Sequence, residues 1–244
     1  MNKLTLLTAG LTLATGASAS AAVISSISTT TGTAGLGSGT TLNYDPAAVT
    51  INLAANVSGP TAADLASPGS DGNGITSLER FWNNAGTGGW FSLADSNTGT
   101  SVGNFNNGYL AFTIEADPGF FLDLDELTFD SAVFTTNNRR GFEVYAEVDG
   151  GTFDSSSDLL VDINDENSLR ANPRNNVVDL TGAEYQGINS IEIRVYSLTD
   201  LASRTIDVDS FVLTGDVTAI PEPSSMVLLA LSSACMLSRR RKDA

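Results

Sequence analysis

The sequence contains no histidine and a single cysteine, Cys235, among its 244 residues. Without histidine, the Ser–His–Asp and Cys–His catalytic arrangements cannot form, and metal sites built on histidine are excluded as well. Cys235 lies in an apolar segment near the C-terminus, so the rest of the chain has no cysteine pair from which to build an internal disulfide.

Basic residues are also scarce: the chain has 12 Lys and Arg against 28 Asp and Glu, a net charge of −16. The body of the chain, residues 22–220, holds 26 acidic residues, seven arginines and no lysine, which gives −19. The absence of lysine from the body excludes a Schiff-base nucleophile and a P-loop lysine. An acidic body of this kind argues against nucleic-acid binding, which needs clustered Lys and Arg, and it repels other anionic polymers unless a cation bridges the two.

A short apolar segment near the N-terminus predicts a secretory signal peptide over residues 1–22. Lys3 provides the charged start, residues 4–14 form the apolar stretch, and residues 17–21 contain two overlapping small-x-small cleavage sites. A buried first helix is the alternative, but the following stretch is rich in Gly, Ser and Thr and lacks helix caps. With about 200 residues left between the two ends, we expect one domain over residues 23–218.

The C-terminal end, residues 219–244, combines three features in a fixed order. A Pro221-Glu222-Pro223 motif is followed by an apolar segment over residues 226–237 and then by the basic residues Arg239, Arg240, Arg241 and Lys242. As a helix, the 12 apolar residues would cover about 18 Å, a marginal transmembrane span for a hydrocarbon core about 30 Å thick. The basic cluster would stay in the cytoplasm, with the bulk of the chain outside.

This tripartite tail resembles the PEP-CTERM sorting signal of Gram-negative bacteria in the order and spacing of its parts. The resemblance implies recognition by an exosortase, transient anchoring in the inner membrane, removal of the hydrophobic tail, and release to or attachment at the cell surface. Proteins with this signal are commonly linked to exopolysaccharide production, so exopolysaccharide is an expected partner.

The body shows the alternation of apolar and polar residues that is typical of half-buried strands. The segments expected as strands are residues 49–55, 89–93, 109–116, 141–148, 190–196 and 205–215. Repeated half-buried strands with polar turns predict an all-β fold, an antiparallel β-sandwich of jelly-roll type. We expect a signal-peptide helix before it and a short hydrophobic helix after it.

The last of these strands has an irregular pattern. Its apolar positions are even-numbered at Ile206 and Val208 but odd-numbered at Phe211 and Leu213. A bulge near Ser210 would explain this change of phase, because one extra residue turns every later side chain to the opposite face.

Residues 105–216 are similar to the jelly-roll ectodomains found upstream of PEP-CTERM tails, and to galactose-binding-like and carbohydrate-binding-module sandwiches. The segments that carry this similarity are residues 109–130, 140–145, 178–182, 191–196 and 206–215. The resemblance supports the sandwich fold and assigns no activity. In related sandwiches a structural calcium ion often uses an Asp of the last strand, which would be Asp207 or Asp209 here.

Two polar strand faces form the main candidate binding site. They carry Glu143, Tyr145 and Glu147 on one strand and Glu192, Arg194 and Tyr196 on another. If the two strands are neighbours, this surface offers aromatic rings for sugar C–H groups and charged partners for sugar hydroxyls. The alternative is that Arg194 is structural and pairs with Glu143 or Glu192 under a loop.

Other candidates are weaker. Trp82 and Trp90 flank a glycine-rich stretch and could form a sugar platform, although Phe81 and Phe91 beside them favour a small apolar core. The loops at residues 71–74 and 162–167 are rich in oxygen ligands for calcium, but neither completes an EF-hand pattern.

These features predict an exported, non-catalytic surface or matrix protein that binds polysaccharide on one sheet face. One alternative is a purely structural acidic protein whose contacts are made through calcium. The other is a glycoside hydrolase, which would need two suitably spaced carboxylates, with Glu115, Glu143 and Glu192 as the candidates.

Overall fold

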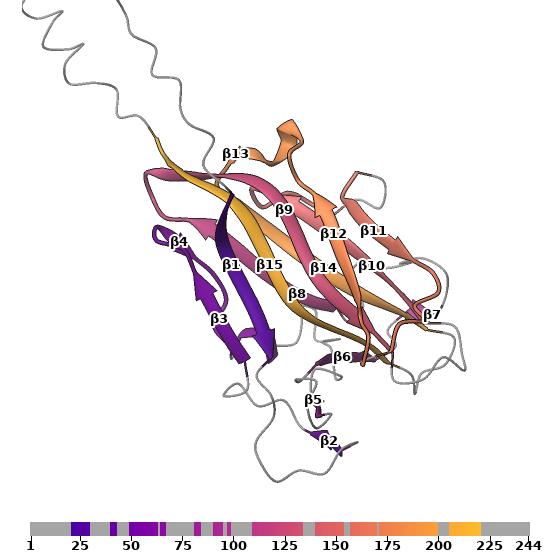
Figure 1. The fold of residues 1–244 in the computed structure, drawn as a ribbon. Coiled ribbons are helices and arrows are strands. Elements are labelled where there is room, and N and C mark those ends of the chain that lie inside the picture. Colours follow the sequence, from indigo (N-terminus) through magenta and orange to yellow (C-terminus); the bar gives the residue numbers. More distant parts are fainter. Residues whose placement is uncertain are drawn as a thin grey trace, which may run out of the picture.

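The computed structural model describes the β-rich body of the chain (Figure 1). The described residues are 21–29, 40–42, 49–62, 64–66, 81–83, 90–94, 97–98, 109–133, 140–153, 157–169, 171–199 and 205–220. Outside them lie the predicted helices of the signal peptide and the tail, the residues Pro221, Glu222, Pro223, Arg239, Arg240 and Arg241, and the loop at 71–74. Across the described ranges, no helix is long and apolar enough to cross a membrane.

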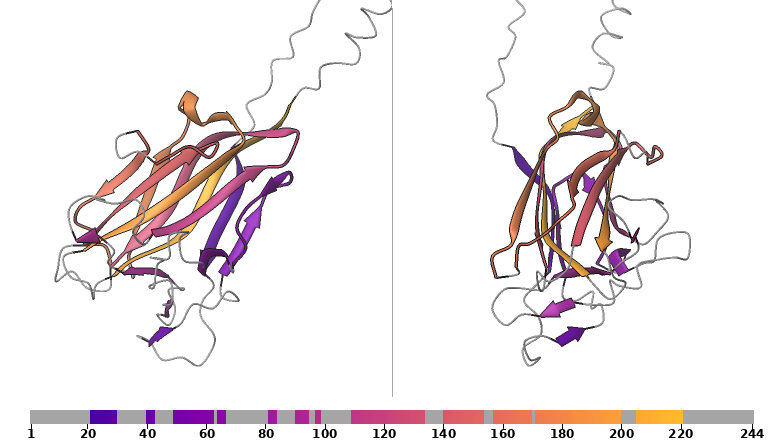
Figure 2. Two further views of the ribbon diagram at one scale, coloured as in Figure 1. Left: turned by 180° about the vertical axis from the view of Figure 1, so that it is seen from behind. Right: turned by 90° about the vertical axis from the view of Figure 1, so that its right-hand side faces the viewer.

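Two β-sheets face each other as two layers (Figure 2). The first sheet runs β12 (Arg174–Asp179), β9 (Phe120–Ala132), β15 (Thr205–Ala219), β6 (Phe91–Ala94), β5 (Phe81–Asn83) and β2 (Thr40–Leu42). β1 (Ala22–Thr29) pairs with β15 and β3 (Val49–Leu53), and β13 (Gln186–Ile188) pairs with β9.

The second sheet runs β11 (Leu159–Ile163), β10 (Arg140–Val148), β14 (Ser190–Thr199), β8 (Tyr109–Ala116) and β4 (Val57–Ser58). β7 (Asn97–Thr98) adds to β14 in parallel, whereas the other strand pairs of both sheets are antiparallel. Two short 3-10 turns, η2 (Asp64–Ala66) and η3 (Ala183–Tyr185), lie in the connections.

The core lies between the two sheets and is formed by the inward-facing side chains of the long strands. Phe129 of β9 stacks on Phe211 of β15 with ring centroids 5.3 Å apart. Phe129 also meets Phe142 of β10 edge-on at 5.8 Å. These three buried rings come from both sheets, so the predicted all-β sandwich is confirmed.

The boundaries of β8, β10 and β14 follow the sequence pattern closely, whereas β9, β11, β12 and β13 were not among the predicted strands. β8 covers the predicted segment, and its alternating residues Leu110, Phe112 and Ile114 are buried in the core. The early strands are shorter or shifted, since β3 ends at Leu53 and β6 begins at Phe91.

The predicted bulge in β15 is confirmed at Ser210. Ser210 has a φ of +57°, and the pairing of β15 with β9 shifts between Asp209 and Val212. Because of the extra residue, Phe211 and Leu213 face the core although Ile206 and Val208 face it before the bulge. β15 also runs four residues beyond the predicted end, to Ala219.

Candidate ligand-binding face

The two predicted polar faces lie side by side on the second sheet. We call this surface, which points away from the first sheet, the outer face. It carries Glu143, Tyr145 and Glu147 of β10, Glu192, Arg194 and Tyr196 of β14, and Tyr109, Ala111, Thr113 and Glu115 of β8. β10 and β14 are paired, with Tyr145 opposite Arg194 and Glu143 opposite Tyr196. Pairing therefore brings all five predicted ligand-binding residues together.

Burial divides these five residues into two groups. Tyr145 is 2% exposed and Tyr196 is fully buried, and their rings meet edge-on at 5.6 Å. The Tyr145 hydroxyl donates a hydrogen bond of 2.7 Å to Oε2 of Glu143, which is itself buried. Together with Leu198, and with the half-buried Tyr109 and Phe153 packed on them, the two tyrosines form a small second core on the outer face.

The buried tyrosines remain protonated at neutral pH. Burial raises the pKa of Tyr196 to about 12, although the hydrogen bond to Arg194 and its charge act in the opposite direction. Burial and the hydrogen bond to Glu143 also raise the pKa of Tyr145. Both hydroxyls therefore act as fixed hydrogen-bonding groups, and neither ring presents a flat face to a ligand.

Arg194 and Glu192 form the accessible part of the predicted site. Nε of Arg194 donates to Oε1 of Glu192 at 2.7 Å, and the two side chains are 17% and 32% exposed. The guanidinium carbon lies 3.9 Å from the ring centroid of Phe153 and 4.4 Å from that of Tyr109. Burial lowers the pKa of Arg194, but hydrogen bonds to Glu192 and Tyr196 raise it on balance, so the cation is retained. Arg194 is thus a fixed positive charge held between two rings.

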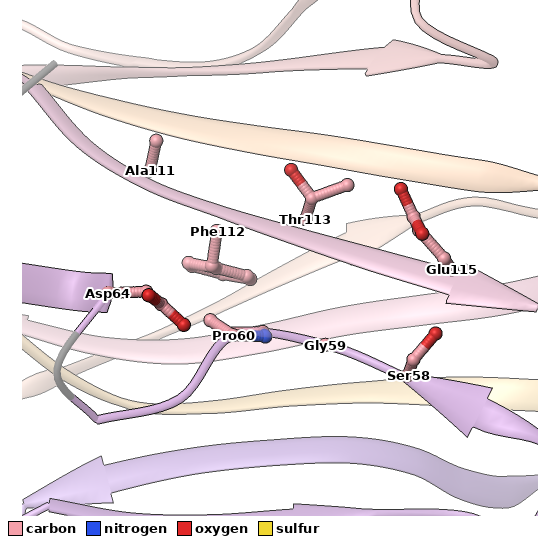
Figure 3. A pocket seen from close by; sticks show the side chains of 8 residues that line it. All are labelled: Ser58, Gly59, Pro60, Asp64, Ala111, Phe112, Thr113 and Glu115. Atoms are coloured by element: carbon pink, nitrogen blue, oxygen red, sulfur yellow. The ribbon is translucent and has the colours of Figure 1, made fainter. Parts of the chain in front are cut away.

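A pocket of about 360 Å³ borders the outer face along β8 (Figure 3). Its walls are Ser58, Gly59, Pro60, Asp64, Ala111, Phe112, Thr113 and Glu115. Thr113 is the register partner of Glu192, so the pocket lies one strand away from the Arg194–Glu192 pair. Sequence patterns gave no sign of it, because its two walls are some fifty residues apart along the chain.

The three carboxylates considered for hydrolysis have different surroundings in the described part of the chain. Glu143 is tied to Tyr145, Glu192 is tied to Arg194, and Glu115 lines the pocket. A different group, Glu147, has its pKa raised by burial and by the charge and hydrogen bond of Asp158. Glu147 lies opposite Glu192 in the β10–β14 ladder.

The predicted calcium residues lie on the first sheet, away from the outer face. Asp207 is fully buried and Asp209 nearly so. Oδ1 of Asp209 accepts the backbone N–H of Thr29 at 2.8 Å, and Oδ2 accepts the hydroxyl of Ser210 at 3.2 Å. In the part of the chain that the structure describes, no three carboxylates gather in a way that could hold a metal ion.

The other oxygen-rich loop and the tryptophans also have structural surroundings. In the loop at 162–167, Glu166 is buried and binds Ser131 and Arg174 through Oε2 and the N–H of Ser168 through Oε1. Trp90 is buried beside Phe91 of the main core, as the apolar alternative predicts, whereas the side chain of Trp82 lies outside the described part.

Asp209 makes the stability of the fold depend on pH. Burial raises its pKa to about 6 from 3.8, so folding favours the protonated form. The protonated Asp209 therefore adds to the free energy of unfolding below pH 4, and this stabilisation is lost as the pH rises through 6. The loss is on the order of 3 kcal/mol. We expect urea unfolding at pH 4, 5, 6 and 7 to show this loss for the natural protein and not for Asp209→Asn. Equal pH dependence of the two proteins would show that Asp209 does not titrate in this range.

Comparison with known proteins adds information on the tail and little on the body. No curated protein matches the sequence. The K3 cleaved adhesin domain of Lys-gingipain from Porphyromonas gingivalis W83 is similar at 16% identity and a TM-score of 0.36, over 72% of this chain and 97% of that one. The K1 cleaved adhesin domain of the same protein is similar at 16% identity and a TM-score of 0.33, over 73% of this chain and 99% of that one.

The tail gives a direct match. Residues 219–242 match the PEP-CTERM protein-sorting motif, and this stretch begins at the last residue of β15. The chain therefore carries a PEP-CTERM sorting motif, which implies recognition by an exosortase, export, and transient membrane anchoring before processing.

Proposed function

We propose that this protein is a non-catalytic component of the cell surface or extracellular matrix that holds a neutral, hydroxyl-rich polysaccharide on the outer face. The sorting motif supports the destination, since it directs an exported protein to exosortase processing. The observation that carries the binding role is the Arg194–Glu192 pair, which is fixed by hydrogen bonding and ring stacking and yet partly exposed.

The pair supplies both kinds of hydrogen-bonding group that a sugar needs. The guanidinium donates to ring and hydroxyl oxygens, and the carboxylate of Glu192 accepts from hydroxyl groups. Because Phe153 and Tyr109 already hold the guanidinium in place, little side-chain freedom is lost on binding. Thr113 and Glu115 continue this row of polar groups toward β4. The buried Tyr196 is hydrogen-bonded to Arg194, and the buried Tyr145 and Glu143 lie beside them on β10.

The charge of the body decides which polysaccharide fits. A net charge of −19 over residues 22–220 repels uronic or sulfated chains, so a neutral glycan is favoured. Calcium could act as a bridge to an acidic glycan, which is the competing structural hypothesis. The two differ in whether binding depends on Arg194 or on the free cation.

Arg194→Lys tests the proposed site. We expect the purified full-length protein to bind one class of neutral glycan on an array of bacterial and algal polysaccharides, with or without a chelator. Lysine keeps the charge but loses the planar fork, so affinity should fall about tenfold. Arg174→Lys is the matched control, because Arg174 also pairs through Nε with a glutamate, Glu166 at 2.9 Å, but on the first sheet.

Other results of this experiment would support one of the competing hypotheses. Equal loss in both variants would point to a general effect on folding and would contradict the proposed site. Binding that follows only calcium or ionic strength would support the structural hypothesis. Release of soluble sugar from a bound glycan, abolished by Glu147→Gln, would identify a hydrolase.

A further inference from the structure

The pocket beside the outer face contains a strand edge that its neighbour leaves unpaired. β4 pairs with β8 only through Val57 opposite Ala116 and Ser58 opposite Glu115. If this register continued, Pro60 would stand opposite Thr113. Proline has no N–H to donate, so the ladder cannot continue past Ser58.

The hydrogen bonds of β8 show which backbone groups face this edge. The N–H of Ala116 points toward the β14 side, where it donates to the carbonyl of Asn189, the residue before β14, at 2.8 Å. The N–H of Asp117 points the other way, to the carbonyl of Asn56 at 2.9 Å. Since successive residues of a strand alternate in direction, Thr113 and Ala111 present their N–H and C=O groups to the β4 side.

These edge groups are free in the described part of the chain. Neither Ala111 nor Thr113 has a hydrogen bond to β4 or to the segment that follows it. The space next to them is the pocket of about 360 Å³, whose lining includes both residues (Figure 3). An unpaired edge of this kind is a template for another strand.

The far wall of the pocket is held away from the edge by its own contacts. Oδ2 of Asp64 accepts the backbone N–H and the hydroxyl of Thr61, both at 2.7 Å, which closes a turn after Pro60. The next residue, Leu65, is buried in the core and anchors the turn. These contacts hold the segment in its place away from β8, which leaves the edge open.

We propose that the β8 edge, meaning the backbone of Ala111 and Thr113 together with this pocket, binds an extended segment of another polypeptide that carries a lysine or arginine. The free N–H and C=O groups are arranged for a peptide backbone, which would pair with them as an added strand. Asp64 and Glu115 at the pocket supply negative charge for the basic side chain. The hydrogen bonds from Thr61 lower the pKa of Asp64, so this carboxylate is ionised at neutral pH.

The charge on the body argues for a partner other than a second copy. Two bodies of −19 repel each other, whereas a basic segment is attracted to the same surface. This site and the proposed polysaccharide site meet at Thr113 and Glu115. The peptide would bind the backbone of β8, whereas the polysaccharide would bind the side chains of the Arg194–Glu192 pair, so either proposal can fail without the other.

The test uses the full-length protein and two labelled heptapeptides, acetyl-TVRVTVT-amide and acetyl-TVEVTVT-amide. Fluorescence anisotropy should show binding of the Arg peptide and at least about tenfold weaker binding of the Glu peptide. Thr113→Pro removes the N–H that faces the edge and leaves the β8–β14 ladder intact, so it should weaken the Arg peptide about tenfold or more. Thr113→Val, which keeps the backbone donor, should stay within about threefold.

Amide exchange provides a readout that does not depend on the proline variant folding. In the natural protein, the Arg peptide should slow exchange at Ala111 and Thr113 and leave Ile114 unchanged, because the amide of Ile114 already faces β14. Three outcomes would overturn the proposal: no peptide binding up to about 1 mM, binding without slowed exchange at the two edge amides, or protection of those amides by a glycan or by a second copy instead.

Discussion

Phe129→Ala should destabilise the sandwich by about 3–5 kcal/mol, the range typical of removing a large aromatic side chain from a core. Phe129 is fully buried, stacks on Phe211 at 5.3 Å and meets Phe142 edge-on at 5.8 Å. Its loss would leave a cavity between the two sheets at the point where rings from both of them meet. Urea unfolding followed by tryptophan fluorescence or circular dichroism measures the change.

Two further variants serve as controls for Phe129→Ala. Phe129→Leu keeps most of the volume and should cost less than about 1.5 kcal/mol. Val177→Ala, on the exposed side of β12, should change stability by less than about 0.5 kcal/mol. If Phe129→Ala lowered the free energy of unfolding by less than Phe129→Leu does, the two sheets would not pack through this ring.

Gly215→Ala should have an effect of similar size, about 3–5 kcal/mol, for a different reason. Gly215 has a φ of +154°, and a Cβ there would lie 2.2 Å from the carbonyl oxygen of Asp123 and 2.9 Å from Cα of Leu124. Both atoms belong to the backbone of β9, which pairs with β15 at this point. The two central strands of the first sheet would have to separate, and unfolding in denaturant should report the loss.

The destabilisation expected for Gly215→Ala has two causes, the strained backbone conformation and the clash of the new Cβ with β9. Gly119→Ala separates them. Gly119 also has a positive φ, +95°, but no atom lies within 4 Å of the position its Cβ would take. It should therefore show only the backbone strain, about 1–3 kcal/mol. Equal destabilisation by the two substitutions would contradict the close approach of β9 and β15.

β8, β10, β14 and β15 were predictable because each carries one apolar face. In β8 and β14 the core residues recur at every second position, and this period survives in the folded sheet. The bulge at Ser210 was predictable for the same reason, since one extra residue is what shifts the phase of alternation within a strand. β2, β5 and β7 are too short to show any period, and they were not predicted. β1, β4, β9, β11, β12 and β13 were not predicted either.

The outer face shows what a pattern of alternation leaves out. Alternation places Tyr145 and Tyr196 on the face of the sheet that points away from the main core. It does not predict which other side chains cover them on that face. Phe153, from the turn after β10, packs over this face together with Tyr109, so polar-face residues became a second core. The partner of Arg194 was also open between Glu143 and Glu192 until geometry selected Glu192.

The position of β15 determines how the protein responds to a pull. β15 lies between β9 and β1 and ends at Ala219, where the sorting motif begins. A force applied through the tail therefore enters the body along the axis of β15. The ladder hydrogen bonds on both sides are perpendicular to that axis, so they are loaded together in shear and do not open one after another. The strand that leads to the tail is thus also the one best placed to bear a force applied to the tail.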